Sequence, residues 1–358
     1  MGTVAATATP SEAQPPAPSA GLGEVAWQQI LAPYAQPRLG RSALDVATAV
    51  LPYLALSAAM YLALDVSYWL VLAIAIPAGG FLMRTFVLYH DCSHGSFLAS
   101  KRANTWLGVV LGLFVFSPFV RWRHDHARHH ATSGDLDRRG AGDVRTLTVA
   151  EYNALGRRAR LGYRIFRNPV LMFGVGPIAA MIVGPRLVSR AARQRMRRSV
   201  MGTNIALVLL VAALCWLMGW REYLEVQLPT VFVAGSLGIW MFYVQHQFEG
   251  AYWESGERWN YVDAALQGSS YLKLPKVLQF FSGNIGLHHI HHLSARIPNY
   301  NLQRAHDENP VFHQVHTLTM RDGLKAVRLK LWDEDSGRMV TYAQARITPP
   351  RVAVAPQQ

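Results

Sequence analysis

The sequence predicts an all-α, multi-pass membrane protein: four transmembrane helices in two hairpins, joined to a histidine-rich helical cap. Hydrophobic residues make up 51% of the 358-residue chain and charged residues only 16%, and the mean hydropathy is +0.11. This composition is apolar for a soluble domain. Four long segments carry no charged residue, and each is close to the roughly 20 residues that cross a bilayer as a helix.

The four uncharged segments are Val46–Leu64, Val66–Met83, Ser199–Trp220 and Val226–Phe248. Only a turn around Asp65 separates the first two, and only Arg221–Glu225 separates the last two. Each pair is therefore expected to form a hairpin, with both links on the same side of the membrane.

Eight of the 14 histidines fall into three tight clusters, which we call the histidine boxes. The boxes contain His90 and His94, then His126, His129 and His130, and finally His288, His291 and His292. Residues three and four apart share one face of a helix, so each box can direct its imidazoles at one point. The boxes contain few acidic residues, and Cys92 is the one cysteine among them.

This donor set predicts two metal ions. Imidazole suits iron, copper, zinc and nickel, and eight of them exceed the four ligands of one tetrahedral zinc. Nearby acids would contact the ligand histidines and balance the metal charge, and the candidates are Asp91, Asp125 and Glu249. Two irons at such a site can use O2 and two external electrons to oxidise an unactivated C–H bond, and the membrane supplies an acyl chain as substrate.

Two further uncharged segments, Ala103–Val120 and Asn168–Pro185, are less regular. If Ala103–Val120 crossed the membrane alone, His90 and His129 would lie on opposite sides and could not share a site. The second segment contains Gly174, Pro177 and other helix breakers. We expect both to be interfacial or re-entrant elements; the alternative is that each is a core helix of the cap.

The charge distribution predicts the orientation. Residues 121–203 contain 17 arginines and 5 acidic residues, a net charge of +12 in a chain of +13. By the positive-inside rule this loop, the boxes and both termini are cytoplasmic, in a bacterial inner membrane. The pI of about 10.0 raises the possibility of nucleic-acid binding, but no zinc-finger or basic-zipper spacing is present. Anionic lipid headgroups are the favoured partner for Arg186–Arg198, with an acidic redox protein as the alternative.

The two ends of the chain are expected to be disordered. Residues 1–23 are rich in Ala, Pro, Thr and Ser and contain no Lys or Arg, and residues 348–358 form a second short tail. Residues 24–347 then form one membrane domain.

The boxes resemble those of a known family. The stretches His90-Asp91-Cys92-Ser93-His94, His126-Ala127-Arg128-His129-His130 and His288-His289-Ile290-His291-His292 look like the three histidine boxes of membrane fatty acid desaturases, and the resemblance extends from about Val46 to about His306. Accessory stretches look most like the omega-6 (delta-12) acyl-lipid branch. They are Gly142-Asp143-Val144 with Glu151-Tyr152, Gln245–Glu249, Asn284-Ile285-Gly286 and Pro298–Leu302.

The resemblance implies a ninth histidine ligand, His246, near the end of the last span. It also implies that Asn284 is a weak ligand or holds a water and that His289 contacts the ligands. The acyl-CoA branch has an Asn where this chain has Phe242, and its first box has one more spacer residue, so an acyl-lipid substrate is favoured. The implied reaction uses two irons, O2 and a ferredoxin-type or similar donor.

Two other functions remain open at this stage. Di-iron lipid hydroxylases and carotenoid ketolases share the boxes, so the sequence alone leaves them as alternatives. A histidine-rich metal transporter is the alternative of another class, but the boxes lie at span ends and in loops, which leaves no ligand path across the bilayer. His124, His306, His313 and His316 fit no box and are expected to be ordinary histidines.

Overall fold

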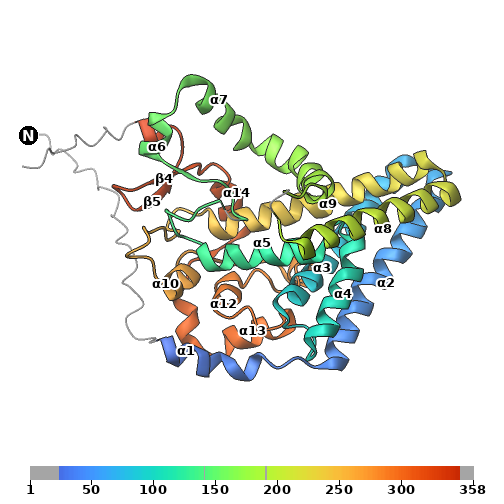
Figure 1. Cartoon of the computed structure of the whole chain (residues 1–358), viewed down its shortest axis with the longest axis horizontal. Helices are drawn as coiled ribbons and strands as arrows, with labels where there is room; N and C mark the ends of the chain where they lie inside the picture. Colours follow the sequence, from blue (N-terminus) through green and yellow to red (C-terminus); the bar gives the residue numbers. More distant parts are fainter. Residues whose placement is uncertain (1–23, 141, 190–191, 347–358) are drawn as a thin grey trace, which may run out of the picture.

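The computed structural model describes residues 24–140, 142–189 and 192–346, so the expected tails at 1–23 and 348–358 lie outside the described residues. The predicted all-α class is confirmed: helices dominate and the strands are few and short (Figure 1). Four helices are long and apolar enough to cross a membrane. They are α2 (Leu39–Leu64), α3 (Tyr68–His94), α8 (Gln194–Met218) and α9 (Trp220–His246).

These helices form the two expected hairpins, and α3 packs against both α2 and α9. The two links lie at the same end, because Val226 near the start of α9 packs with Met60 and Val71 of the first hairpin. The second link was predicted at Arg221–Glu225, and that is wrong. The chain turns at Gly219, whose φ of 90° favours glycine, and Arg221–Glu225 already lies within α9.

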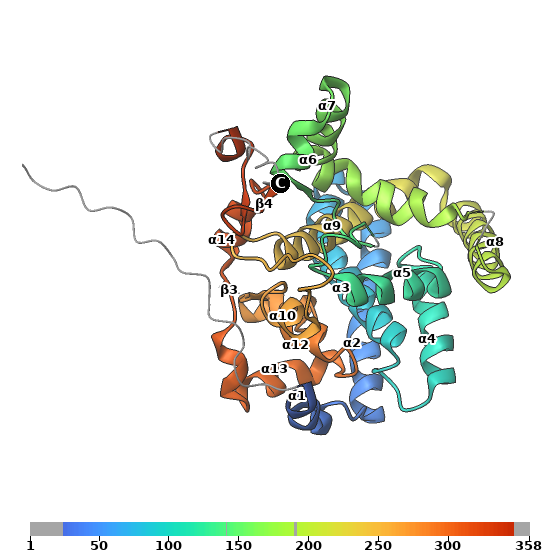
Figure 2. The same cartoon turned by 60° about the vertical axis from the view of Figure 1, so that its left-hand side comes forward.

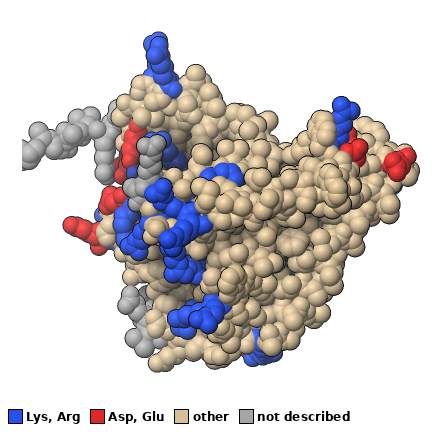
Figure 3. Space-filling model, turned by 45° about the vertical axis from the view of Figure 1, so that its right-hand side comes forward, with Lys and Arg blue, Asp and Glu red and all other residues tan. Residues whose placement is uncertain are grey.

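Helix α8 lies at the edge of the bundle, and only 11% of its apolar 18-residue stretch is buried. Val208 and Trp216 are among the apolar residues that it exposes. In Figure 3 the surface beyond the Lys and Arg side chains at the left is largely free of charge until the far tip. An uncharged belt of this kind is what a bilayer would cover.

The segment predicted to dip and return forms α4 (Lys101–Phe114) and α5 (Phe119–Thr132), which are bent by 102° relative to each other. The turn is tight: a Cβ on Gly112 would lie 2.5 Å from the Ser117 carbonyl oxygen, and Phe116 has a φ of 53°. As a result α5 brings the second histidine box back to the first. The His90 and His126 ring centroids are 4.7 Å apart.

The other irregular segment is not a straight helix. It contains the π-helical turns η2 (Leu171–Val175) and η3 (Ile178–Val183), followed by the 3₁₀ turn η4 (Gly184–Arg186). These turns pack on α9, where Ser236 Oγ donates to the Phe173 carbonyl at 2.7 Å. The glycines and prolines of this segment therefore prevent a straight α-helix, as expected.

The remaining helices form a cap around the end of the bundle at which α3 and α9 terminate (Figures 1 and 2). Its α-helices are α1 (Glu24–Leu31), α6 (Val149–Ala154), α7 (Arg157–Phe166), α10 (Tyr261–Leu266), α11 (Lys276–Phe281), α12 (His288–Leu293), α13 (Asn299–Asp307) and α14 (Met320–Ala326). Three 3₁₀ turns complete it, η1 (Ala32–Tyr34), η5 (Pro310–Gln314) and η6 (Gln344–Arg346).

Two small sheets, which the sequence did not indicate, connect distant parts of the cap. Strand β4 (Leu331–Asp333) pairs in parallel with β1 (Leu147–Thr148) and antiparallel with β5 (Arg338–Val340). Strand β2 (Tyr271–Leu272) pairs in parallel with β3 (Thr317–Leu318). The first sheet connects the C-terminal part of the chain to the loop after α5.

The main hydrophobic core lies where α3, α9 and α12 meet, and it joins the bundle to the cap. Leu88 and Tyr89 of α3, Val244 of α9 and Ile290 of α12 belong to it, and none of the four is measurably exposed. Each lies within two residues of a box histidine or of His246. Tight packing therefore fixes the backbone from which these histidines project.

Candidate metal centre

The structure brings together all nine histidines that the sequence and the resemblance singled out. They form two groups, and within each group one ring nitrogen of every residue lies within 4.8 Å of the others. Group 1 contains His90, His94, His126, His130 and His291. Group 2 contains His129, His246, His288 and His292.

Helical spacing explains how the residues are divided. In α5, His126 and His130 are four apart and belong to group 1, whereas His129 points to group 2. In α12 the arrangement is the reverse, because His288 and His292 belong to group 2 and His291 to group 1. Helices α5 and α12 thus each contribute histidines to both groups.

The nitrogen positions fit metal ions. His288 Nε2 lies 2.9 Å from His246 Nε2 and 3.2 Å from His292 Nε2. In group 1, His130 Nε2 lies 3.1 Å from both His126 Nε2 and His291 Nε2. Two nitrogens at about 2.1 Å from one ion and 90° apart are separated by about 3 Å. One proton can bridge only one pair of nitrogens, whereas an ion at the centre of the set satisfies every lone pair.

Three ligand candidates are oriented through their second ring nitrogen. The Nδ1–H of His129 donates to the Asp143 carboxylate, that of His246 donates to the Gly268 carbonyl at 3.2 Å, and that of His90 donates to Asp91 Oδ1 at 3.3 Å. Such a bond fixes the tautomer, so that the unprotonated Nε2 faces the group. Asp91 was expected in this role, whereas Asp143 had been noted only as part of an accessory stretch.

Asp91 is itself held by the cap. Its Oδ2 accepts hydrogen bonds from the Asn299 backbone amide at 2.7 Å and from Asn299 Nδ2 at 3.0 Å. Asn299 belongs to the stretch Pro298–Leu302, but nothing in the local sequence indicated this contact. The first box is therefore anchored to the start of α13.

Two expected contacts are absent. Asp125 had been a candidate to contact the ligand histidines, but its carboxylate pairs with exposed His124 at 3.1 Å and with Arg121 at 3.5 Å. Glu249 faces Arg338 at 3.5 Å on the surface. The predicted contacts of Asp125 and Glu249 with the ligand histidines were wrong for one reason. Each residue is close to a histidine in the sequence, but its side chain extends towards solvent and pairs there.

His289 also lies outside the two groups, and Asn284 supports a residue next to the first box. Asn284, in the left-handed region with φ 58°, donates from Nδ2 to the Asn299 carbonyl at 3.1 Å, so it supports the residue that holds Asp91. His289 is fully buried on the other face of α12, with its ring 5.4 Å from that of His306. The role that the resemblance implied for Asn284, as a weak ligand or the holder of a water, stays a prediction, and so does a contact of His289 with the ligands.

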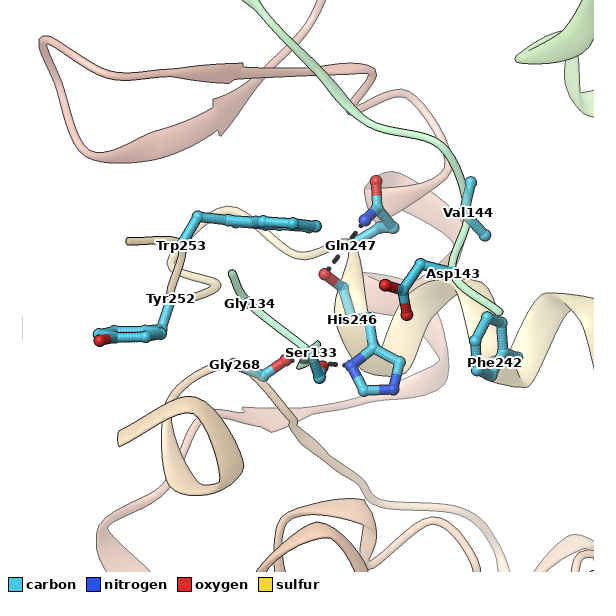
Figure 4. A pocket seen from close by; sticks show the side chains of 10 residues that line it. All are labelled: Ser133, Gly134, Asp143, Val144, Phe242, His246, Gln247, Tyr252, Trp253 and Gly268. Atoms are coloured by element: carbon cyan, nitrogen blue, oxygen red, sulfur yellow. Dashed lines mark hydrogen bonds between the residues drawn. The ribbon is translucent and has the colours of Figure 1, made fainter. Parts of the chain in front are cut away.

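Of the group 2 histidines, His246 lines a cavity of about 10 Å³, the size of one water molecule. Figure 4 shows Asp143 beside His246 on one side of it, with Phe242 nearby. The Phe242 ring lies 5.0 Å from that of His129 and 5.3 Å from that of His246. An aromatic ring therefore occupies the position at which the acyl-CoA branch has an Asn.

Burial favours the neutral form of three ligand histidines on α12. Burial, and then the neighbouring imidazoles, hold the pKa of His288, His291 and His292 well below the usual range. Neutral imidazoles have free lone pairs, which is the form that binds a metal. The donor set thus suits a metal cofactor without thiolates.

Comparison with known proteins gives the family. Residues 67–322 match the model of the family described as fatty acid desaturase. The chain belongs to the fatty acid desaturase family. As a desaturase it is an oxidoreductase, and its four apolar helices fit an integral membrane protein.

Among the relatives of this desaturase is the fatty acid desaturase of Bacillus subtilis (strain 168), which is 44% identical over 89% of this chain and 91% of its own length. The sn-1 oleoyl-lipid 12-desaturase of Synechocystis is 28% identical over 84% of both chains. The sn-1 acyl-lipid omega-3 desaturase (ferredoxin) of the same organism is 26% identical over 66% of this chain and 65% of its own. The matches confirm the resemblance to the desaturases and to the branch that contains the 12-desaturases.

Proposed function

We propose that this chain is a membrane di-iron, O2-dependent acyl-lipid desaturase. The observation that carries the proposal is the pair of histidine groups at one end of the bundle, with five and four ring nitrogens. Group 1 would hold one iron and group 2 the other. When bound, the two irons would supply the activation of O2, so that O2, two electrons from an external donor, two protons and two hydrogens of adjacent methylenes would yield two water molecules and the double bond.

The chain's own residues would hold the centre in place. Asp143, Asp91 and the Gly268 carbonyl orient His129, His90 and His246. Burial shields His288, His291 and His292 from bulk water. A dry, fixed site limits the escape of reactive species into water.

Metal analysis of the purified protein tests the cofactor. We expect about two irons per chain, and reconstitution with Fe(II) and a reductant should restore turnover to metal-free protein. One zinc per chain in active protein would refute the di-iron proposal.

We further propose that the substrate is an acyl chain esterified in a glycerolipid and that the new cis double bond is at delta-12. The accessory stretches and the relatives named oleoyl-lipid 12-desaturase support this position. Expression in a host rich in oleoyl lipids, with mass-spectrometric location of the double bond, is the test. A diene with the new bond at delta-12 is expected. A new bond elsewhere in a saturated chain would refute the position but leave the desaturase intact, and a hydroxylated product would favour the hydroxylase alternative.

The electron donor is proposed to be a ferredoxin-type protein, as the name of one relative states for that relative. The cap is proposed to face the cytoplasm of a bacterial inner membrane, because the arginine-rich loop at 121–203 belongs to that side. Reporter fusions at Asp65 and Gly219 should then report the outer side, and fusions at Gly140 and Arg304 the inner side. Opposite locations for Gly140 and Arg304 would contradict this topology.

A further inference from the structure

A large basic cavity lies beside group 1. It measures about 700 Å³ and is open to the outside. His94 forms part of its wall, together with its neighbours Cys92 and Ser93. The remaining wall comes from the first turns of α4 and α8, from α5, and from the segment after α12.

Five cationic side chains line this cavity: Lys101, Arg102, Arg123, Arg195 and Arg296. Within 24–140, 142–189 and 192–346, none of the five has a carboxylate within 4.0 Å. Burial, and then the charge of Arg195, lower the pKa of Arg123, so these two cations are close enough to repel each other. Unpaired like charges around a hollow are destabilising unless an anion enters it.

The helix ends increase this positive potential. Neither α4 nor α8 has an acidic residue in its first turn, where the partial positive charge of a helix favours an anion. The loop before α4 is also fixed: Asn104 Oδ1 accepts from the Leu98 amide at 3.0 Å and Asn104 Nδ2 donates to the Ser100 carbonyl at 3.0 Å. The cations of α4 are therefore presented by a rigid backbone.

Apolar, exposed residues follow the cations on both helices. Trp106 lies one turn after Arg102 and is 67% exposed, and on α8 Met201 and Ile205 are exposed as well. A basic turn followed by an exposed apolar face is the arrangement found where a helix enters a membrane. Figure 3 shows the same contrast on a larger scale, with basic side chains gathered next to an uncharged surface.

We propose that the cavity binds the phosphate of an anionic glycerophospholipid substrate. The proposal rests on the proposed acyl-lipid function and specifies the substrate class for the same site. A hollow of this size suits a lipid headgroup, whereas a protein donor needs a contact surface of about 800 Å² per partner. The lipid is therefore preferred to a redox protein as the occupant.

Lipid binding can be measured without turnover. Spin-labelled phosphatidylglycerol and phosphatidylcholine with identical saturated chains are added to the purified protein in detergent. We expect a preference for phosphatidylglycerol of about tenfold or more, and the triple variant Lys101→Gln, Arg102→Gln, Arg195→Gln should reduce it to about twofold or less. Arg157→Gln, on α7 outside the cavity, is the matched control and should keep the preference.

A charge-retaining variant, Lys101→Arg with Arg102→Lys, should bind like the unmodified protein, which separates loss of charge from misfolding. Equal binding of the two lipids by the unmodified protein, or a preference that survives in the triple variant, would overturn the proposal. Displacement of phosphatidylglycerol by an equal concentration of glycerol phosphate would show a free-phosphate site instead.

Kinetics separates this inference from the proposed function. In the triple variant we expect KM for phosphatidylglycerol to rise about tenfold or more with kcat little changed. Slower reduction by ferredoxin at an unchanged lipid preference would make the cavity a donor-docking site and refute the lipid assignment. Selective binding without any desaturation would leave the cavity assignment in place and count against the desaturase.

Discussion

Arg167 and Gln247 are hydrogen-bonded in the interior of the protein, with Arg167 Nη2 2.8 Å from Gln247 Oε1. The Arg167 side chain is fully buried, and it also donates to the Tyr243 hydroxyl at 2.9 Å and to the Leu329 carbonyl at 3.2 Å. It thus connects the arginine-rich loop to the last turn of α9 and to the segment before β4. Since Gln247 follows His246 directly, this network positions one end of group 2.

Replacing Arg167 by Met should destabilise the protein by about 3 kcal/mol, because several buried acceptors lose their donor at once. The thermal midpoint in detergent should fall by about 5 °C or more. The matched control is Arg164→Met on α7, three residues before Arg167, which removes one partly buried bond to Tyr152. Equal midpoints for the two variants would show that the network contributes little.

Loss of one histidine should affect both metals, because α5 and α12 each supply both groups. We expect His130→Ala to retain well under one iron per chain rather than one of two. The control is His124→Ala, which changes an exposed residue on the same helix. Elemental analysis that finds one full iron in His130→Ala would show that the groups load independently.

Asp143→Ala should weaken iron binding by about 10- to 100-fold, since His129 loses the acceptor that fixes its tautomer. Asp125→Ala removes a carboxylate that touches neither group and should leave the affinity unchanged. Competition with a chelator of known affinity provides the measurement. Weaker iron binding in Asp125→Ala than in Asp143→Ala would show that Asp125, and not Asp143, supports the ligand histidines.

The metal-free protein should lose stability as the pH falls below about 6.5. His288, His291 and His292 have a lowered pKa in the folded state, so the unfolded chain takes up protons first. Their contribution is present above the unfolded pKa and decreases towards acid pH, by up to about 1.4 kcal/mol per pH unit for each residue. Thermal midpoints between pH 8 and 5 measure the slope, and a flat profile would contradict the neutral, buried state.

The turn between α4 and α5 should not accept a side chain at Gly112. A Cβ there would lie 2.5 Å from the Ser117 carbonyl, so Gly112→Ala is expected to cost about 1–3 kcal/mol and to disturb α5. Gly162→Ala on α7 meets nothing within 4 Å and should stabilise by up to about 1 kcal/mol. The two variants should thus shift the thermal midpoint in opposite directions.

Hydropathy predicted the existence of the spans better than their ends. The predicted second span stopped at Met83 because Arg84 follows, yet α3 continues to His94. The charge does not end the helix, since Arg84 pairs with buried Asp45 at 3.0 Å instead of facing lipid. A partner that is distant in sequence cannot be found from local composition.

The histidine boxes could be predicted because their spacing is a local pattern. The expectation that each box directs its imidazoles at one point was wrong for the second and third boxes, because α5 and α12 divide theirs between the two groups. Asp143, Asn299 and Arg167 act through contacts made only after distant segments pack, so no local pattern indicated their roles. The strands were missed for a related reason: two or three residues are too short to show an alternating pattern.

The sheet that joins β1 to β4 and β5 has a consequence for biosynthesis. Leu147–Thr148 leaves the ribosome early, but its partners Leu331–Asp333 and Arg338–Val340 emerge among the last described residues. A polypeptide folds from its N-terminus during synthesis, so this pairing has to wait until translation is almost complete. The loop with Asp143 is therefore tied to the C-terminal part of the cap only then, so a nascent chain already inserted in the membrane would still have an incomplete cap around the histidine groups.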